Sequence, residues 1–265
     1  MKSGQVSRMR GSRRMTRVGS AMSAMPLFIL AVGLVLVESG MHAAEVSPAA
    51  DECVILLHGL ARTEDSLDRL EDAARVAGYV VVNLGYRSRD DRIEVLAEDV
   101  IPRALQRCHS ANTRQVHFIT HSLGGILVRY YLARHGLADL GRVVMLSPPN
   151  QGSEAADDLH DLALYKWLNG PAGQQLLTGP DGLPTQLGPV DFPLGIITGN
   201  RHAFFDAWLA DLFPGEHDGK VSVERAKVEG MSDFLVVPVS HPFIMDDEEV
   251  ITQSLHFLRN GRFRR

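Results

Sequence analysis

Ser122 stands between a segment typical of a buried strand and a segment typical of a helix. Residues 116–119 are Val-His-Phe-Ile, and residues 126–132 are Ile-Leu-Val-Arg-Tyr-Tyr-Leu. A sharp strand-to-helix turn presents a serine hydroxyl at the end of the strand, where it can act as a nucleophile. Such a turn needs small neighbours, and Gly124 is one, whereas Thr120 stands where glycine is usual. The alternative interpretation is a turn whose glycines serve close packing only.

Two further segments add to this pattern. Residues 54–57, Val-Ile-Leu-Leu, are typical of a buried strand and lead into His-Gly-Leu at 58–60, and residues 146–153 are Leu-Ser-Pro-Pro-Asn-Gln-Gly-Ser. Together with the turn at Ser122, these segments resemble a bacterial lipase/esterase family of the α/β-hydrolase fold. The resemblance covers nearly all of residues 53–260 and implies a serine hydrolase.

The resemblance also implies an oxyanion hole made by two main-chain N–H groups, those of Leu60 and Leu123. Preorganised donors of this kind stabilise the negative charge that develops on the carbonyl oxygen during acyl transfer. Because the hole uses main-chain donors, we expect the His58 side chain to form local hydrogen bonds that shape the loop.

A serine nucleophile needs a general base, and the base needs an acid that orients it. The family's chain order is serine, acid, histidine. The candidate acids after the predicted strand 193–198 are Asp206, Asp211, Glu216 and Asp218. We favour Asp218, because the Gly and the valine-rich stretch after it resemble the family's acid loop. Asp206 and Asp211 lie in a short amphipathic segment that is typical of a solvated helix.

The general base should follow the last strand, predicted at residues 233–239. His241 is the histidine in that place. His217 is adjacent to Asp218 and is interpreted as a surface loop residue, and His256 falls within the last predicted helix. Pro238 favours an edge position or a strand end at this point.

The remaining elements alternate between strands and helices, which predicts a mostly parallel sheet with helices on both faces. No room exists before Cys53 for the first two strands of this fold, so we expect a reduced, six-stranded α/β-hydrolase sheet. The predicted strands are 53–57, 79–84, 116–121, 142–147, 193–198 and 233–239, and the predicted helices are 65–77, 91–107, 123–135 and 246–259. Asp91 and Glu94 suggest a capped start for the second helix, and Pro102 should kink or split it.

Residues 151–192 lack regular alternation. An apolar helix around residues 159–168 is followed by a loop rich in Gly and Pro from 170 to 193. The fold places a cap or lid at this point, and an apolar cap would bind acyl chains. The alternative is a crossover helix followed by a long surface loop, and the sequence favours neither.

Residues 1–44 differ from the rest of the chain. Six Lys and Arg residues precede an apolar core at 25–37, and small residues follow at 43–44. This is the form of a secretory signal peptide. Counting from Ala21 extends the apolar segment to 17 residues, so an uncleaved anchor in the inner membrane is the alternative. We therefore expect a periplasmic or secreted α/β-hydrolase domain at residues 45–265.

The charge balance bears on the partners. The leader carries a net charge of +5 and the whole chain −5, which leaves −10 for residues 45–265. An acidic domain disfavours nucleic acid as a partner. We expect a small-molecule or lipid ester substrate, with membrane proximity only through the N-terminal segment. The proposed chemistry needs no metal and no organic cofactor.

Cys53 and Cys108 are the two cysteines of the chain. In the fold that the resemblance implies, both fall at the N-terminal edge of the sheet, where a bridge can form. Exported proteins favour such pairs as disulfides. Two buried thiols are the alternative, and the sequence leaves both open.

The function predicted from these residues is that of a serine esterase or lipase. Ser122 is the nucleophile, His241 the general base and Asp218 the orienting acid. An acyltransferase or thioesterase with the same three residues is the first alternative. A non-catalytic binding protein on the same scaffold is the second.

Overall fold

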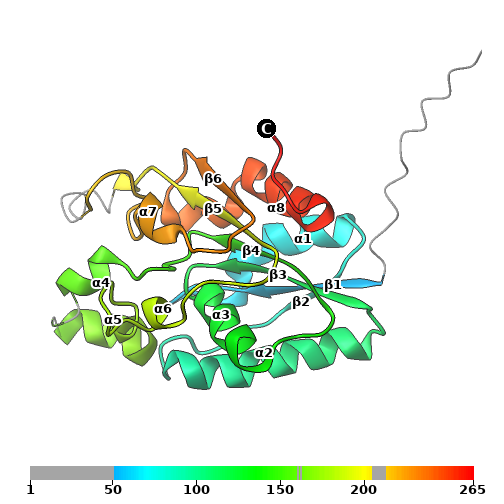
Figure 1. Ribbon diagram of the computed structural model, residues 1–265, viewed down its shortest axis with the longest axis horizontal. Helices are drawn as coiled ribbons and strands as arrows, with labels where there is room; N and C mark the ends of the chain where they lie inside the picture. Colours follow the sequence, from blue (N-terminus) through cyan, green and yellow to red (C-terminus); the bar gives the residue numbers. More distant parts are fainter. Residues whose placement is uncertain (1–50, 160, 162, 205–212) are drawn as a thin grey trace, which may run out of the picture. The chain divides into compact units, whose positions relative to one another are not determined.

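The computed structural model describes residues 51–265 except 160, 162 and 205–212. Its centre is a parallel sheet of six strands in the order β2-β1-β3-β4-β5-β6 (Figure 1). The fold class predicted from the sequence is confirmed, and every pairing is parallel. The strands are β1 (Glu52–Leu57), β2 (Val80–Asn83), β3 (Gln115–His121), β4 (Leu140–Leu146), β5 (Leu194–Gly199) and β6 (Asp233–Val237).

Alternation of side chains along the strands produces two apolar cores, one on each face of the sheet. In β1, Ile55 and Leu57 point into one core and Val54 and Leu56 into the other. The first core is covered by α2 (Ile93–Ser110) and α3 (Leu123–His135), and the second by α1 (Asp68–Val76) and α8 (Glu248–Asn260) (Figure 1). Among the described residues, further helices are η1 (Glu64–Leu67), α4 (Glu154–Leu159), α5 (Ala163–Gln174), α6 (Leu183–Gln186), α7 (Val223–Ala226) and η3 (His241–Asp246).

The start of α2 corrects a prediction. Asp91 does not cap this helix, because the N-cap residue is Arg92 and its side chain forms no capping hydrogen bond. The N–H of Ile93 instead donates to the side-chain oxygen of Gln175 at 2.7 Å. Pro102 does not split the helix either, which runs unbroken from Ile93 to Ser110. A partner distant in the sequence has replaced the local cap.

Residues 151–192 contain more regular structure than the sequence predicted. Part of the expected Gly- and Pro-rich loop is helical, since α5 extends to Gln174 and α6 follows at Leu183. Gly170 interrupts α5 with a φ of +60°, and a Cβ at this position would collide with the carbonyl group of Arg89. Glycine therefore lets this segment lie against the loop that follows β2.

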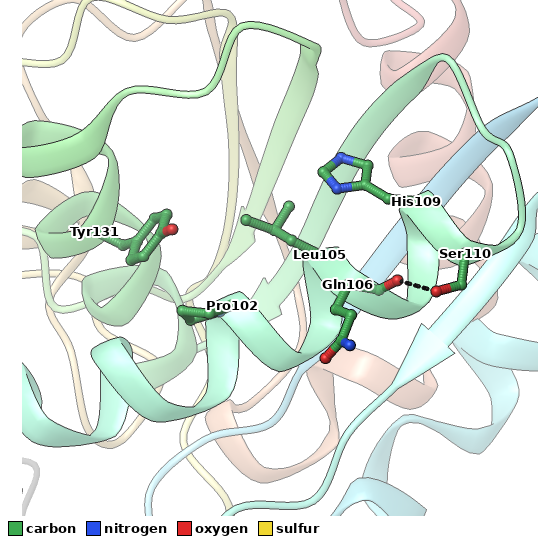
Figure 2. A pocket seen from close by; sticks show the side chains of 6 residues that line it. All are labelled: Pro102, Leu105, Gln106, His109, Ser110 and Tyr131. Carbon is green, nitrogen blue, oxygen red and sulfur yellow. Dashed lines mark hydrogen bonds between the residues drawn. The ribbon is translucent and has the colours of Figure 1, made fainter.

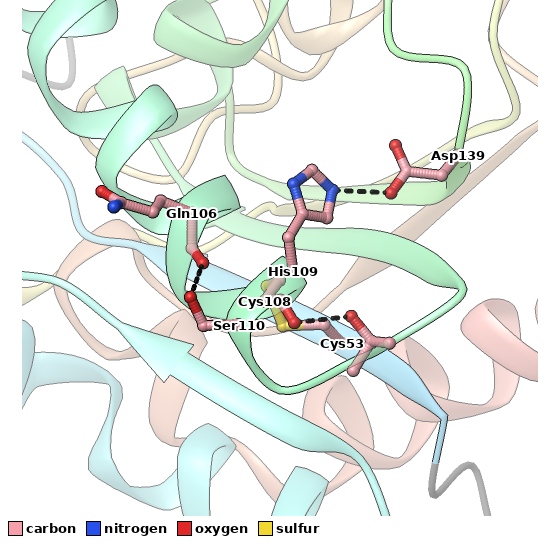
Figure 3. The surroundings of a disulfide bond; sticks show 7 residues. Cys53, Gln106, Cys108, His109, Ser110 and Asp139 are labelled. Atoms are coloured by element: carbon pink, nitrogen blue, oxygen red, sulfur yellow. Dashed lines mark hydrogen bonds and ion pairs between the residues drawn. A yellow bond between two sulfur atoms is a disulfide. The ribbon is translucent and has the colours of Figure 1, made fainter.

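A disulfide joins Cys53, at the start of β1, to Cys108, in the last turn of α2 (Figure 3). Their Cα atoms lie 5.7 Å apart, and both residues are fully buried. This decides between the two interpretations that the sequence left open. The bridge attaches α2 to the central sheet at the edge where β1 begins.

Removing the disulfide should destabilise the protein, because the bridge closes a loop with a sequence separation of 55 residues. For a loop of this length we expect Cys53→Ala with Cys108→Ala to lower the free energy of unfolding by about 4 kcal/mol. The corresponding fall in Tm is roughly 10 °C. Thermal unfolding followed by circular dichroism measures it, with and without reductant. The Tm of the double variant should not respond to reductant, and a wild-type Tm equally insensitive would contradict the bridge.

Candidate active site

Ser122 forms the turn between β3 and α3 with φ +50° and ψ −118°. Positive φ is unfavourable for a residue with a side chain and persists only where the surroundings impose it. Here the Ser122 N–H donates to the carbonyl oxygen of Leu146 at 2.9 Å, and its own carbonyl accepts from Gly125 N–H at 3.0 Å. Neighbouring strand β4 and the first turn of α3 therefore hold the serine in the strained conformation.

Gly124 and Gly125, on the helix side of the turn, leave space for the close contacts around Ser122. A Cβ on Gly124 would lie 2.5 Å from the carbonyl oxygen of Leu57. A Cβ on Gly125 would lie 3.2 Å from the hydroxyl of Thr120 and 3.1 Å from the sulfur of Met145. Thr120 is fully buried, so the space that it needs comes from Gly125. This explains how threonine is accommodated where glycine is usual.

Asp218 and His241 form a buried pair. His241 Nδ1 lies 2.8 Å from Asp218 Oδ2, and the main-chain N–H of His241 donates to the Asp218 carbonyl oxygen at 2.9 Å. The second carboxylate oxygen, Oδ1, accepts from the N–H groups of Lys220 and Val221, each at 2.9 Å. Burial raises the pKa of this carboxyl, but His241, the Ser147 hydroxyl and Val221 N–H outweigh burial and leave the pKa below its usual value.

Ser122, Asp218 and His241 all lie at the edge of the sheet formed by the carboxyl ends of its parallel strands. Ser122 follows β3, and His241 follows β6. Strand β6 ends at Val237, so Pro238 lies at a strand end, one of the two positions that the sequence predicted for it. Beside β5, a Cβ on Gly199 would lie 3.1 Å from Asp218 Cβ. Ser122 is 8% and His241 9% exposed. No hydrogen bond within the described part of the chain joins the Ser122 hydroxyl to the His241 ring.

The loop after β1 lies directly beside this edge. A Cβ on Gly59 would lie 3.2 Å from Ser122 Cβ, so glycine allows the loop to approach the serine. Neither the N–H of Leu60 nor that of Leu123 donates to another group among the contacts of the described residues. These two N–H groups therefore have no acceptor among the described contacts, and their role as oxyanion donors stays a prediction.

His58 has the local role that the sequence predicted. Its Nδ1 lies 2.8 Å from the carbonyl oxygen of Gly59, and its Nε2 accepts from the N–H of Tyr86 at 3.3 Å. The Tyr86 ring stacks on the imidazole at 4.1 Å, and its hydroxyl donates to the His58 carbonyl oxygen at 2.6 Å. The His58 side chain therefore shapes the loop.

The other predicted candidates do not join the pair. Glu216 accepts a hydrogen bond from Asn200 at 3.1 Å, and His256 lies in α8. His217 corrects a prediction, because it is buried and accepts from the Gly219 N–H at 3.1 Å rather than lying on the surface. Asp206 and Asp211 lie outside the described residues, as do residues 1–44.

Ser147 was not singled out by the sequence analysis. It follows β4 with a φ of +47° and is fully buried. Its hydroxyl has no hydrogen-bond partner among the described residues, but it lies close enough to Asp218 to help lower the pKa of that carboxyl. The segment at 146–153 contains it, but no local pattern marks it, because its proximity to Asp218 depends on strand order.

Burial of neutral histidines should make stability depend on pH. Burial lowers the pKa values of His58, His117 and His121 in the folded protein. Unfolded histidines bind protons near pH ~6.5, so the free energy of unfolding should fall as pH drops below that value towards the lower folded pKa values. We expect a lower midpoint of urea unfolding at about pH 5 than at about pH 8. His117→Gln should weaken this dependence, and a midpoint constant over the range would contradict the expectation.

Other features of the described residues lie away from this edge. An open surface pocket of about 550 Å³ beside α2 and α3 is lined by Pro102, Leu105, Gln106, His109, Ser110 and Tyr131, none of them a residue of the candidate site (Figure 2). Within the described ranges, no group of three His, Cys, Asp or Glu side chains could hold a metal ion. No described helix is long and apolar enough to cross a membrane.

A parallel sheet with a strained serine turn and a buried Asp–His pair at its carboxyl edge is the architecture of the α/β class of hydrolases. The alpha/beta hydrolase family model matches residues 54–251. This chain therefore belongs to the alpha/beta hydrolase family. No curated protein sequence matches the chain significantly.

Solved structures with this fold include lipolytic enzymes. The mature lipase BlEst2 of Bacillus licheniformis is 21% identical with a TM-score of 0.64, over 79% of this chain and 93% of the lipase. Phospholipase PlaB of Legionella pneumophila is 22% identical with a TM-score of 0.55, over 66% of this chain and 45% of PlaB. An esterase of Thermogutta terrifontis is 14% identical with a TM-score of 0.51, over 79% and 90%. At these identities the similarity shows the fold.

Proposed function

We propose that this protein is a carboxylic ester hydrolase that works through an acyl-enzyme on Ser122. The observation that carries the proposal is the buried hydrogen bond between Asp218 and His241 at the sheet edge where Ser122 is held in strained geometry. The lipase and the esterase among the structurally similar proteins agree with it.

Protonation states follow from the contacts. A carboxylate only accepts hydrogen bonds, so the proton of a neutral His241 ring lies on Nδ1, 2.8 Å from Asp218. The lone pair is then on Nε2, which takes the proton from the Ser122 hydroxyl as the oxygen attacks the ester carbonyl. His241 next gives this proton to the leaving alcohol, and Asp218 stabilises the imidazolium in between.

The N–H groups of Leu60 and Leu123 stabilise the oxyanion in this mechanism. Both are main-chain donors beside Ser122 without another acceptor among the described contacts. Water activated by His241 then attacks the acyl-enzyme, which releases the acid and restores the serine. Every proton in these steps is carried by Ser122, His241, the substrate or water, and Asp218 stays ionised throughout.

Two alternatives use the same scaffold differently. A thioesterase or acyltransferase would use the same three side chains, with a thioester as substrate or an alcohol in place of water. A binding protein would use none of them as reacting groups. A fully buried carboxylate paired with histidine is expensive to desolvate, which favours a reacting site over a binding site.

Labelling with a fluorescent organophosphonate tests the proposal. The wild-type chain should be labelled covalently, and Ser122→Ala should not. p-Nitrophenyl esters of increasing chain length, beside matched thioesters, then separate an esterase from a thioesterase. A folded wild-type chain that is neither labelled nor active on any ester would overturn the proposal in favour of a binding protein.

We also propose that the protein is exported. The leader-like composition of residues 1–44 and the disulfide between Cys53 and Cys108 agree with an oxidising compartment. N-terminal sequencing of the natively expressed protein should find a start near Ala44 or Glu45, in the periplasmic or secreted fraction. A start at Met1 in the membrane fraction would indicate an uncleaved anchor instead.

A further inference from the structure

The His121 side chain lies between the loops that carry the proposed base and a proposed oxyanion donor. Its Nε2 is 3.2 Å from the carbonyl oxygen of His241, and the two ring centroids are 4.8 Å apart. On its other side, a Cβ on Gly59 would lie 2.7 Å from His121 Nδ1. A single side chain therefore contacts both loops, and it belongs to the residue directly before Ser122.

The hydrogen bond determines which form of the ring is present. A carbonyl oxygen only accepts, so the Nε2 of His121 carries a proton and donates it to His241. The Nδ1 atom is buried and has no hydrogen-bond partner in the described part of the chain. Burial, and next the positive charge that His241 acquires, hold the pKa of His121 well below its usual value. The ring is therefore neutral and does not compete with His241 for the serine proton.

Three polar groups of His241 are held by the protein. Its N–H donates to the Asp218 carbonyl at 2.9 Å, its Nδ1 lies 2.8 Å from the Asp218 carboxylate, and its carbonyl accepts from His121 at 3.2 Å. The backbone of His241 also begins η3, so the bond from His121 adds a side-chain restraint to a carbonyl group at the start of that helix. Because His121 precedes Ser122, it links the positions of base and nucleophile.

We propose that His121 is a positioning residue for the hydrolysis reaction. It holds the backbone of His241 and the Gly59 turn at a fixed placement relative to Ser122, without touching substrate. The proposal rests on the function proposed above. Small displacements of reacting groups cost large factors in rate, so the effect should fall on kcat, whereas substrate binding should change little because the ring is buried.

Two substitutions in the full chain separate positioning from packing. His121→Phe keeps a ring of similar shape and loses the donor, and His121→Gln keeps an N–H donor without the ring. We expect His121→Phe to lower kcat roughly 10- to 100-fold with KM within about twofold. His121→Gln should recover most of the loss. His117→Gln is the matched control, because His117 lies on the same strand and bonds Arg142 and Glu52 at the opposite edge; its kcat should equal that of wild type.

A second measurement needs no substrate. The Nδ1 proton of His241, bonded to Asp218, should give a downfield signal in proton NMR spectra. The signal should persist in wild type and His121→Gln and broaden or vanish in folded His121→Phe.

The proposal is overturned if His121→Phe retains both the signal and kcat within about twofold. It is equally overturned if both variants lose kcat and Tm in parallel, which indicates packing alone. Failure of wild type to react with the organophosphonate would instead refute the proposed function, and the NMR comparison would still decide whether His121 holds His241.

Discussion

Ser122→Ala should abolish ester hydrolysis while the protein remains folded. The mechanism forms a covalent bond to the serine oxygen, and alanine offers no replacement. We expect a loss of about 10⁴- to 10⁶-fold in kcat, since the remaining donors and binding contacts keep only residual catalysis. Steady-state hydrolysis of a p-nitrophenyl ester measures the loss, with background hydrolysis subtracted.

The variant should keep its fold for a structural reason. Alanine has the Cβ that already occupies the turn at φ +50°, so the strain is unchanged, and the main-chain bonds to Leu146 and Gly125 remain. Circular dichroism and Tm should therefore match wild type. Near wild-type turnover in such a folded variant would rule out Ser122 as the nucleophile.

Asp218→Asn should lower kcat by about 10⁴-fold. The carboxylate accepts from His241 Nδ1 at 2.8 Å and from two main-chain N–H groups through its other oxygen. If the asparagine oxygen retains the two main-chain bonds, its amide group donates to Nδ1. The ring proton then moves to Nε2, and the base can no longer accept the serine proton.

Matched variants test whether this loss belongs to Asp218. Glu216→Gln removes a nearby carboxylate that bonds Asn200, and its kcat should stay within about twofold of wild type. Asp206→Asn and Asp211→Asn should also be mild. If Asp206→Asn lowers kcat by orders of magnitude and Asp218→Asn does not, the acid that orients the base is Asp206 and not Asp218.

The sequence alone determined those features that depend on neighbouring residues. A short apolar run, a serine and a glycine two residues later predicted a strand-to-helix turn at Ser122. In the structure β3 ends and α3 begins on either side of this serine. Alternation of apolar runs with helical periodicity predicted all six strands in one parallel sheet. Chain order pointed to His241 after the last strand, where it lies. These signals are local, so a single chain suffices to detect them.

Tertiary structure decided what depends on contacts between distant residues. The sequence pointed to Asp218 only through resemblance, and the tertiary structure adds the 2.8 Å contact that brings its side chain to His241. The state of Cys53 and Cys108 was open for the same reason. At the start of α2, a Gln175 side chain from a distant segment replaced the cap predicted at Asp91. The contact of His121 with two loops follows from strand order and burial. Strand order sets such distances, and hydrophobic periodicity carries no information about which strand ends become neighbours.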